Sequence, residues 1–123
     1  MKNFLKLFIG TLVFTQFSFC QNYDANLISK NTELNFMETK IRGIEIDEII
    51  YYVEKDLQTL SAYKNNKLKW QTNIISFCGK PTVGKSEIRY LKFKTNKLFI
   101  VFGKHSFAEV EIVDGKTKFI GSD

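Results

Sequence analysis

The chain has 123 residues, with 18 basic and 13 acidic side chains and a formal net charge of +5. Its single histidine and two cysteines exclude a structural zinc site, which takes four Cys or His ligands. The 12 Phe and 5 Tyr residues are enough to build an aromatic-rich core in a chain of this length. The composition therefore indicates one small globular domain.

The first 20 residues have the pattern of a secretory signal peptide. Two lysines in the first six residues precede an apolar stretch that ends at Phe19 and is too short for a comfortable membrane span of about 20 residues. Ser18 and Cys20 stand two apart, as small residues do before a cleavage site, so we expect cleavage before Gln21. The alternatives are a short N-terminal anchor, a buried strand, or a lipoprotein acylated on Cys20, although Phe19 fits a lipoprotein poorly.

We therefore expect an exported protein, periplasmic or secreted, with no transmembrane segment in the mature chain. Cleavage would leave Cys78 as the single cysteine, which excludes an internal disulfide. A lone cysteine is more typical of a small buried residue than of a nucleophile. An intermolecular bridge through Cys78 stays open.

The charges are unevenly distributed along the chain. Removing residues 1–20 leaves 16 basic and 13 acidic residues, a net charge of +3. Residues 21–63 carry −4, residues 64–104 carry +9, and residues 105–123 carry −2. A basic block of this kind can attract an anionic partner, but lysines on strands also serve solubility and discourage edge-to-edge pairing.

The residue pattern beyond the N-terminal arm is that of β-strands. Residues 21–38 are polar and aperiodic, and we expect an arm there with at most one short strand at Leu34–Met37. From Lys40 onward, short apolar or alternating runs are separated by Asn, Asp, Gly and Lys turns. Residues 47–63 could form an amphipathic helix, but their dense Ile, Tyr and Val favour strands.

An internal similarity divides the β-rich region in two. At an offset of 49 residues, Ile50–Trp70 lies over Phe99–Phe119, with both turns and the closing K-x-K-aromatic aligned. Upstream, KIRGIEI (Lys40–Ile46) resembles EIRYLKF (Glu87–Phe93). A repeat of this length with four strands per unit is typical of propeller blades. We predict an all-β fold of two consecutive antiparallel four-stranded meanders, at about 40–75 and 87–121, joined by 76–86 in one domain, 39–123.

Each unit resembles a blade of the PQQ-like (quinoprotein-type) β-propeller repeat. In the first unit the matching residues are Ala62, Tyr63, Asn66, Lys67 and Trp70. In the second unit they are Asp114, Gly115, Lys116 and Phe119. Two blades cannot close a propeller, which takes at least about four. The chain would therefore pair its sheets face to face, assemble with other copies, or dock on a partner.

The stretch GKPTVGKS (Gly79–Ser86) matches the phosphate-loop pattern G-x-x-x-x-G-K-[ST]. The preceding NIISFC (Asn73–Cys78) could be the strand that such a loop follows. The following residues alternate around a turn at Thr95-Asn96-Lys97 and predict a hairpin, whereas a phosphate loop must lead into a helix. We therefore reject nucleotide binding for this stretch.

The sequence names no convergent catalytic group. His105 stands in a predicted turn, no G-x-S-x-G stretch is present, and two units are too few for a quinone site. We expect no enzyme activity, no cofactor, and no catalytic or metal-binding residues. Alternation places several cations on the outward faces of strands, where they could bind an anion or a partner or simply confer solubility. These candidates are Lys67, Lys69, Arg89, Lys92 and Lys94.

These observations favour a non-enzymatic β-repeat protein that acts by protein–protein interaction at the cell envelope, as a scaffold, adaptor or inhibitor. Its partner would be another envelope protein or a second copy of the chain. The alternative is a small envelope protein that binds anionic ligands or surfaces through the basic segment 64–104.

Overall fold

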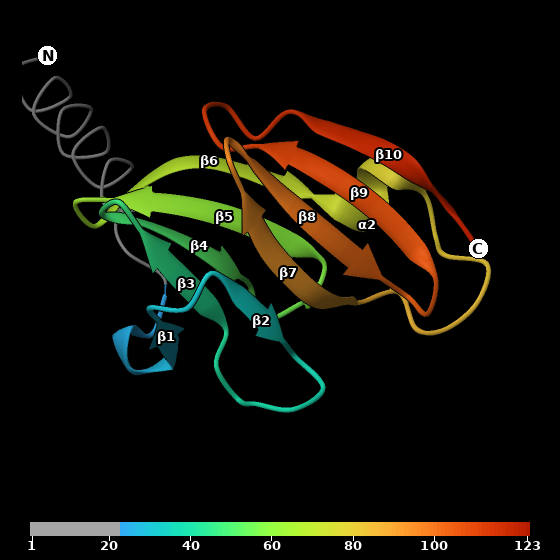
Figure 1. The fold of residues 1–123 in the computed structure, drawn as a ribbon, viewed down its shortest axis with the longest axis horizontal. Helices are drawn as coiled ribbons and strands as arrows, with labels where there is room; N and C mark the ends of the chain where they lie inside the picture. Colours follow the sequence, from blue (N-terminus) through green and yellow to red (C-terminus); the bar gives the residue numbers. More distant parts are fainter. Residues whose placement is uncertain (1–22) are drawn as a thin grey trace, which may run out of the picture.

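The computed structural model describes residues 23–123, and the expected signal peptide, its cleavage site and Cys20 lie outside this range. Two sheets of five strands account for most of the described chain (Figure 1). The first sheet has the order β1 (Ile28–Ser29), β3 (Gly43–Ile46), β4 (Ile49–Val53), β5 (Thr59–Lys64) and β6 (Lys67–Asn73). The second has the order β10 (Thr117–Ser122), β9 (Ser106–Glu111), β8 (Lys97–Phe102), β7 (Ile88–Lys94) and β2 (Glu33–Asn35).

The prediction of an all-β fold is confirmed. Strands β3–β6 and β7–β10 each form an antiparallel meander, which we call the first and the second meander. At the 49-residue offset, β4, β5 and β6 fall on β8, β9 and β10. The turn expected at Thr95-Asn96-Lys97 does separate β7 from β8, although Lys97 is already the first residue of β8. Asp114 and Gly115 lie in the turn between β9 and β10.

The N-terminal segment completes both sheets, so each has five strands instead of the four that were predicted. After the 3-10 turn η1 (Ala25–Leu27), β1 pairs in parallel with β3 of the first sheet. The chain then crosses over, and β2 pairs antiparallel with β7 of the second sheet. The short strand expected at Leu34–Met37 corresponds to β2, at Glu33–Asn35. Strand β1 was not expected, because two residues are too few to show an alternating pattern and its partner β3 lies further along the chain.

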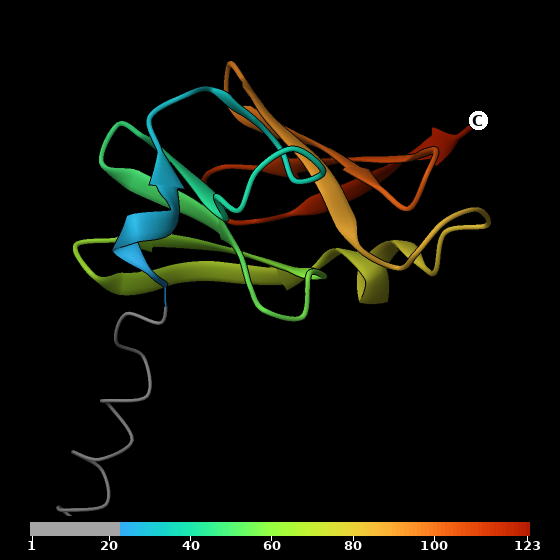
Figure 2. The ribbon, with the colours of Figure 1, turned by 90° about the horizontal axis from the view of Figure 1, so that it is seen from below.

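The two sheets pack face to face around one apolar core, and Figure 2 shows them as separate layers. The first sheet contributes Ile44, Tyr51, Val53, Leu60, Ala62 and Trp70, and the second contributes Leu34, Ile88, Leu91, Leu98, Ile100, Phe102, Ala108 and Val110. Paired sheets in which alternate residues point inward are the usual way for β-sheets to bury apolar side chains. Of the three arrangements left open by the repeat, the described chain has the face-to-face one.

Trp70 links the sheets at the side of β6 and β10. Its indole nitrogen donates a hydrogen bond to the Ile112 carbonyl at 2.7 Å. The indole ring lies against Gly115, where an added Cβ would be 2.5 Å from a ring carbon. Gly115 also has a φ of 78°, a left-handed conformation that favours glycine. The turn before β10 is therefore shaped to hold the Trp70 ring.

The connection between the meanders contains a short helix, α2 (Ile74–Cys78), in place of the strand considered for NIISFC. The Asn73 side chain accepts a hydrogen bond from the Ser76 amide at 2.9 Å and caps the helix at its first turn. Ile74 and Ile75 point into the core. Periodicity could not assign this apolar run, because a short buried helix and a short buried strand show the same run of apolar residues. No helix in residues 23–123 is long and apolar enough to cross a membrane.

Candidate functional site

The structure does not gather the predicted cations on one surface. Lys67 and Lys69 lie on β6, the outermost strand of the first sheet, whereas Lys92 and Lys94 lie on β7 in the second sheet. Lys69 stands beside a register shift in the pairing of β5 with β6. Lysines and bulges are the devices with which proteins keep an edge strand from pairing with another chain. The geometry at Lys67 and Lys69 therefore suits edge protection.

Acidic side chains accompany the cations on the outer face of the second sheet. Lys92 stands directly opposite Glu33 on β2. Lys97 forms ion pairs with Glu109 and Glu111, at 3.8 Å and 3.7 Å. The Lys94 ammonium lies 5.5 Å from the centre of the Phe99 ring. This face thus carries charges of both signs.

The GKPTVGKS loop follows α2 and leads into strand β7, so the strand–loop–helix arrangement of a phosphate loop is not formed here. Gly84 of this loop and Gly103 of the turn between β8 and β9 let the two segments pack closely. A Cβ on Gly84 would lie 2.6 Å from the Lys104 nitrogen, and one on Gly103 would lie 2.4 Å from Pro81. The Lys104 amide also donates to the Val83 carbonyl at 2.8 Å.

Other reactive side chains lie apart from one another. Cys78, at the end of α2, is half-buried against the core, and burial raises the pKa of its thiol. The protonated thiol that this favours is a poor nucleophile. His105 is exposed in the turn between β8 and β9, as expected. Within residues 23–123, no group of three or more His, Cys, Asp or Glu side chains is placed to hold a metal ion.

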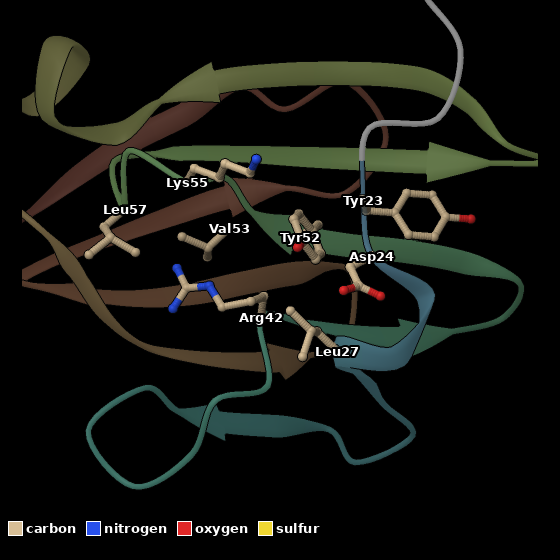
Figure 3. Close-up of a pocket in the computed structure, with 8 residues that line it drawn as sticks. All are labelled: Tyr23, Asp24, Leu27, Arg42, Tyr52, Val53, Lys55 and Leu57. Carbon is tan, nitrogen blue, oxygen red and sulfur yellow. The ribbon is translucent and has the colours of Figure 1, made fainter.

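A hollow of about 520 Å³ opens beside the first sheet, and we call it the Arg42 pocket (Figure 3). Its lining comes from the N-terminal segment, the approach to β3, strand β4 and the turn after β4. The lining residues are Tyr23, Asp24, Leu27, Arg42, Tyr52, Val53, Lys55 and Leu57. Three aliphatic side chains thus stand beside two cations, two phenols and one carboxylate. The volume is within the usual range of small-ligand pockets, about 300–1,000 Å³.

Backbone hydrogen bonds hold Arg42 in the wall of this pocket. Its amide donates to the Leu27 carbonyl at 2.8 Å, and its own carbonyl accepts from the Val53 amide at 2.9 Å. The side chain extends toward Leu57 and away from Asp24 (Figure 3). The guanidinium carbon lies 4.8 Å from the centre of the Phe36 ring. Arg42 is thereby fixed at its base and along one face, with its charged end at the pocket.

The guanidinium of Arg42 lacks an acceptor. Its Nη2 atom is buried without a hydrogen-bond partner, and none of the ion pairs within residues 23–123 involves Arg42. Burial lowers the pKa of Arg42, while Tyr52 and Glu87 nearby act in the opposite direction. Arginine stays protonated at neutral pH even so. A buried donor on a charged group is costly when it is unpaired, so such a group calls for an acceptor from elsewhere.

Arg89, one of the predicted cations, lines a second hollow of about 400 Å³, which we call the Arg89 pocket. The GKPTVGKS loop, the turn between β8 and β9 and the start of β7 form its walls. The lining residues are Met37, Val83, Gly84, Lys85, Glu87, Arg89, Gly103 and Lys104. The Arg89 Nε atom is also buried without a partner. In the described part of the chain, Arg42 Nη2 and Arg89 Nε are the two buried side-chain nitrogen or oxygen atoms in this state.

Sequence reasoning found Arg89 but missed Arg42, Lys55 and the two tyrosines. Arg42 belongs to the acidic segment 21–63, where a count of charges gives no reason to single it out. The internal repeat does relate Arg42 to Arg89, because the Ile-Arg pair of KIRGIEI recurs in EIRYLKF.

Comparison with known proteins adds no relative. A scan against protein-family models, a search of curated proteins and a search of solved structures each gave no match.

Proposed function

We propose that this domain is a non-enzymatic binding protein that takes an anionic group of its ligand onto Arg42. The observation that carries this proposal is the buried, unpartnered Nη2 of a guanidinium that is already fixed in the wall of a ligand-sized hollow. A carboxylate or similar anion at this guanidinium supplies an acceptor for a charge-assisted hydrogen bond. In the expected mature, exported form, the ligand would be met at the cell envelope.

The pocket also indicates which part of a ligand accompanies the anion. Leu27 and Leu57 offer apolar surface next to Arg42, and Lys55 adds a second positive charge. The Arg42 guanidinium points away from Asp24 (Figure 3), whose carboxylate accepts a hydrogen bond from the Asn26 amide at 2.9 Å. The arrangement suits an aliphatic chain that ends in a carboxylate.

The test uses hexanoate and its neutral counterpart hexanol as probes. Each is titrated into ¹⁵N-labelled protein of residues 21–123, and amide and arginine side-chain shifts are followed by NMR. Hexanoate should shift the resonances of Arg42, Tyr52 and Leu57, and hexanol should bind at least tenfold more weakly. Arg42→Gln should weaken hexanoate binding about 10- to 100-fold, because a hydrogen bond to a charged group contributes about 1.5–3 kcal/mol.

Lys67→Gln is the matched control, since it also removes one positive charge but lies on the edge strand β6, outside the pocket lining. It should change the affinity less than twofold. Equal binding of hexanoate and hexanol, or equal losses in the two variants, would contradict the proposal.

A further inference from the structure

Arg42 and Arg89 stand at equivalent positions of the two meanders. Each follows an isoleucine in the aligned stretches KIRGIEI and EIRYLKF, Arg42 just before β3 and Arg89 at the start of β7. Each has a buried side-chain nitrogen without a partner. The same feature thus occurs twice in one small domain, once in each repeat, and one isolated packing defect does not account for it.

The two arginines are neighbours in space. Phe36 connects them: its amide donates to the Arg89 carbonyl at 3.0 Å, and its ring lies 4.8 Å from the Arg42 guanidinium carbon. Glu87 lines the Arg89 pocket and also acts electrostatically on Arg42. Leu57 lines the Arg42 pocket, and its carbonyl accepts from the Ile88 amide, next to Arg89, at 2.7 Å. These contacts make the two hollows neighbours in the fold.

The combined surface is basic and partly apolar. Five basic side chains line the two hollows: Arg42, Lys55, Lys85, Arg89 and Lys104. Two acidic side chains, Asp24 and Glu87, stand against them. Met37 and Val83 line the Arg89 pocket and are 72% and 47% exposed. Large apolar side chains that are exposed beside unpaired cations are typical of a surface that a partner covers.

We propose that the two pockets form one docking surface for an acidic segment of a partner protein. One carboxylate of the segment binds Arg42, a second binds Arg89, and an apolar side chain of the segment packs against Met37 and Val83. This inference rests on the proposed anion-binding function and adds the second arginine and the class of partner. Exposed apolar side chains favour a peptide over a purely ionic polymer, since salt bridges alone would leave Met37 and Val83 in water.

The experiment uses fluorescein-labelled peptides in fluorescence anisotropy with the protein of residues 21–123. One peptide has eight residues that alternate glutamate and leucine, and its control has glutamine in place of glutamate. The variants are Arg42→Gln, Arg89→Gln, the double variant and Lys94→Gln, which removes an exposed cation from the same strand as Arg89. Thermal unfolding of each variant reports whether it is folded, and Arg42→Lys and Arg89→Lys replace any variant that is not.

We expect the acidic peptide to bind at least tenfold more tightly than the glutamine peptide. Each arginine substitution should weaken its binding about tenfold, the double variant should lose more than either single variant, and Lys94→Gln should change it less than twofold. Met37→Ser should weaken the acidic peptide severalfold and leave hexanoate binding unchanged.

The outcomes separate this inference from the function on which it rests. If Arg89→Gln binds the peptide as the wild type does while Arg42→Gln loses hexanoate, the shared surface is refuted and the single anion site stands. If neither arginine affects either probe, both are refuted. Tighter binding to vesicles of phosphatidylglycerol than to the acidic peptide, or equal losses in Lys94→Gln and Arg89→Gln, would also overturn the shared surface.

Discussion

The two meanders have the same strand order, yet the aromatic residues that close their aligned patterns differ in burial. Trp70 is 8% exposed and Phe119, its counterpart at the 49-residue offset, is 44% exposed. Trp70 reaches across the sandwich to the Ile112 carbonyl and Gly115. Phe119 lies on the edge strand β10 at a register shift, with its ring centre 6.3 Å from that of Phe102. The sequence repeat therefore specifies the order of the strands, whereas the burial of each aromatic side chain depends on the residues that the opposite sheet places against it.

The outer faces of the two sheets differ as well. On the first sheet, Tyr23 from the N-terminal segment packs on Tyr52 and Tyr63, with ring centres 6.0 Å and 4.9 Å away, and both of these tyrosines are buried. On the second sheet, Phe99 and Phe107 stack at 5.9 Å and remain half-buried among charged residues. The N-terminal segment thus covers the first sheet and, through the same contacts, builds part of the Arg42 pocket.

The largest expected effect on stability is a difference between substitutions of Trp70 and of Phe119. Trp70→Ala should lower the free energy of unfolding by about 3–5 kcal/mol, because it leaves a cavity in the core and removes the hydrogen-bond donor to the Ile112 carbonyl. Phe119→Ala should cost less than about 1 kcal/mol, since nearly half of that side chain is already in water. Urea unfolding followed by fluorescence or circular dichroism measures both. Equal losses of unfolding free energy in the two variants would contradict the difference in burial between Trp70 and Phe119.

A smaller effect compares the tyrosine–carboxylate pair of each sheet. The Tyr63 hydroxyl donates to Glu54 at 2.7 Å, and the Tyr90 hydroxyl donates to Glu33. Burial, followed by these carboxylates, raises the pKa of Tyr90 to about 12 and the pKa of Tyr63 further still. Because the folded state then holds protons that the unfolded state releases, the free energy of unfolding should be intact below about pH 10 and fall between about pH 10 and 12.

Urea midpoints at pH 8, 10 and 11 test this dependence. Tyr63→Phe should cost about 1–2 kcal/mol at pH 8, because Glu54 loses a partner in a half-buried place, and Tyr90→Phe should cost less. Each variant should lose less stability than the wild type between pH 10 and 11. A wild-type midpoint that rises over this interval would contradict the assigned pKa directions.

The sequence allowed much of the architecture to be predicted and little of the candidate site. The alternation of apolar and polar residues, together with the turn residues, was enough to predict the strands of both meanders. Each hairpin joins strands that are adjacent in sequence, and the alternation identifies the apolar face of each strand. Strand β1 and helix α2 were missed, since β1 depends on its pairing with β3 and α2 on the Asn73 cap. Strand β2 was expected at Leu34–Met37, slightly further along the chain than its observed bounds, Glu33–Asn35. The predicted cations Lys67, Lys69, Lys92 and Lys94 are outward-facing but lie on two different sheets.

Arg42 could not be found from its own segment for a physical reason. An unpartnered donor is a property of the folded surroundings, and its neighbours Leu27, Phe36 and Val53 come from three separate segments of the chain. The predicted protein–protein role at the cell envelope and the resemblance to PQQ-like blades remain predictions. The paired arginines give the protein–protein role a specific surface on which it can be tested.

A crystal structure of residues 21–123 grown with hexanoate would show whether Arg42 binds an anion. We expect electron density for the carboxylate within hydrogen-bond distance of the Arg42 guanidinium, with the aliphatic chain along Leu27 and Leu57. Contradiction would come from a structure in which the Glu87 carboxylate bonds directly to Arg42 and hexanoate is absent from the pocket, because Arg42 would then have an acceptor from its own chain.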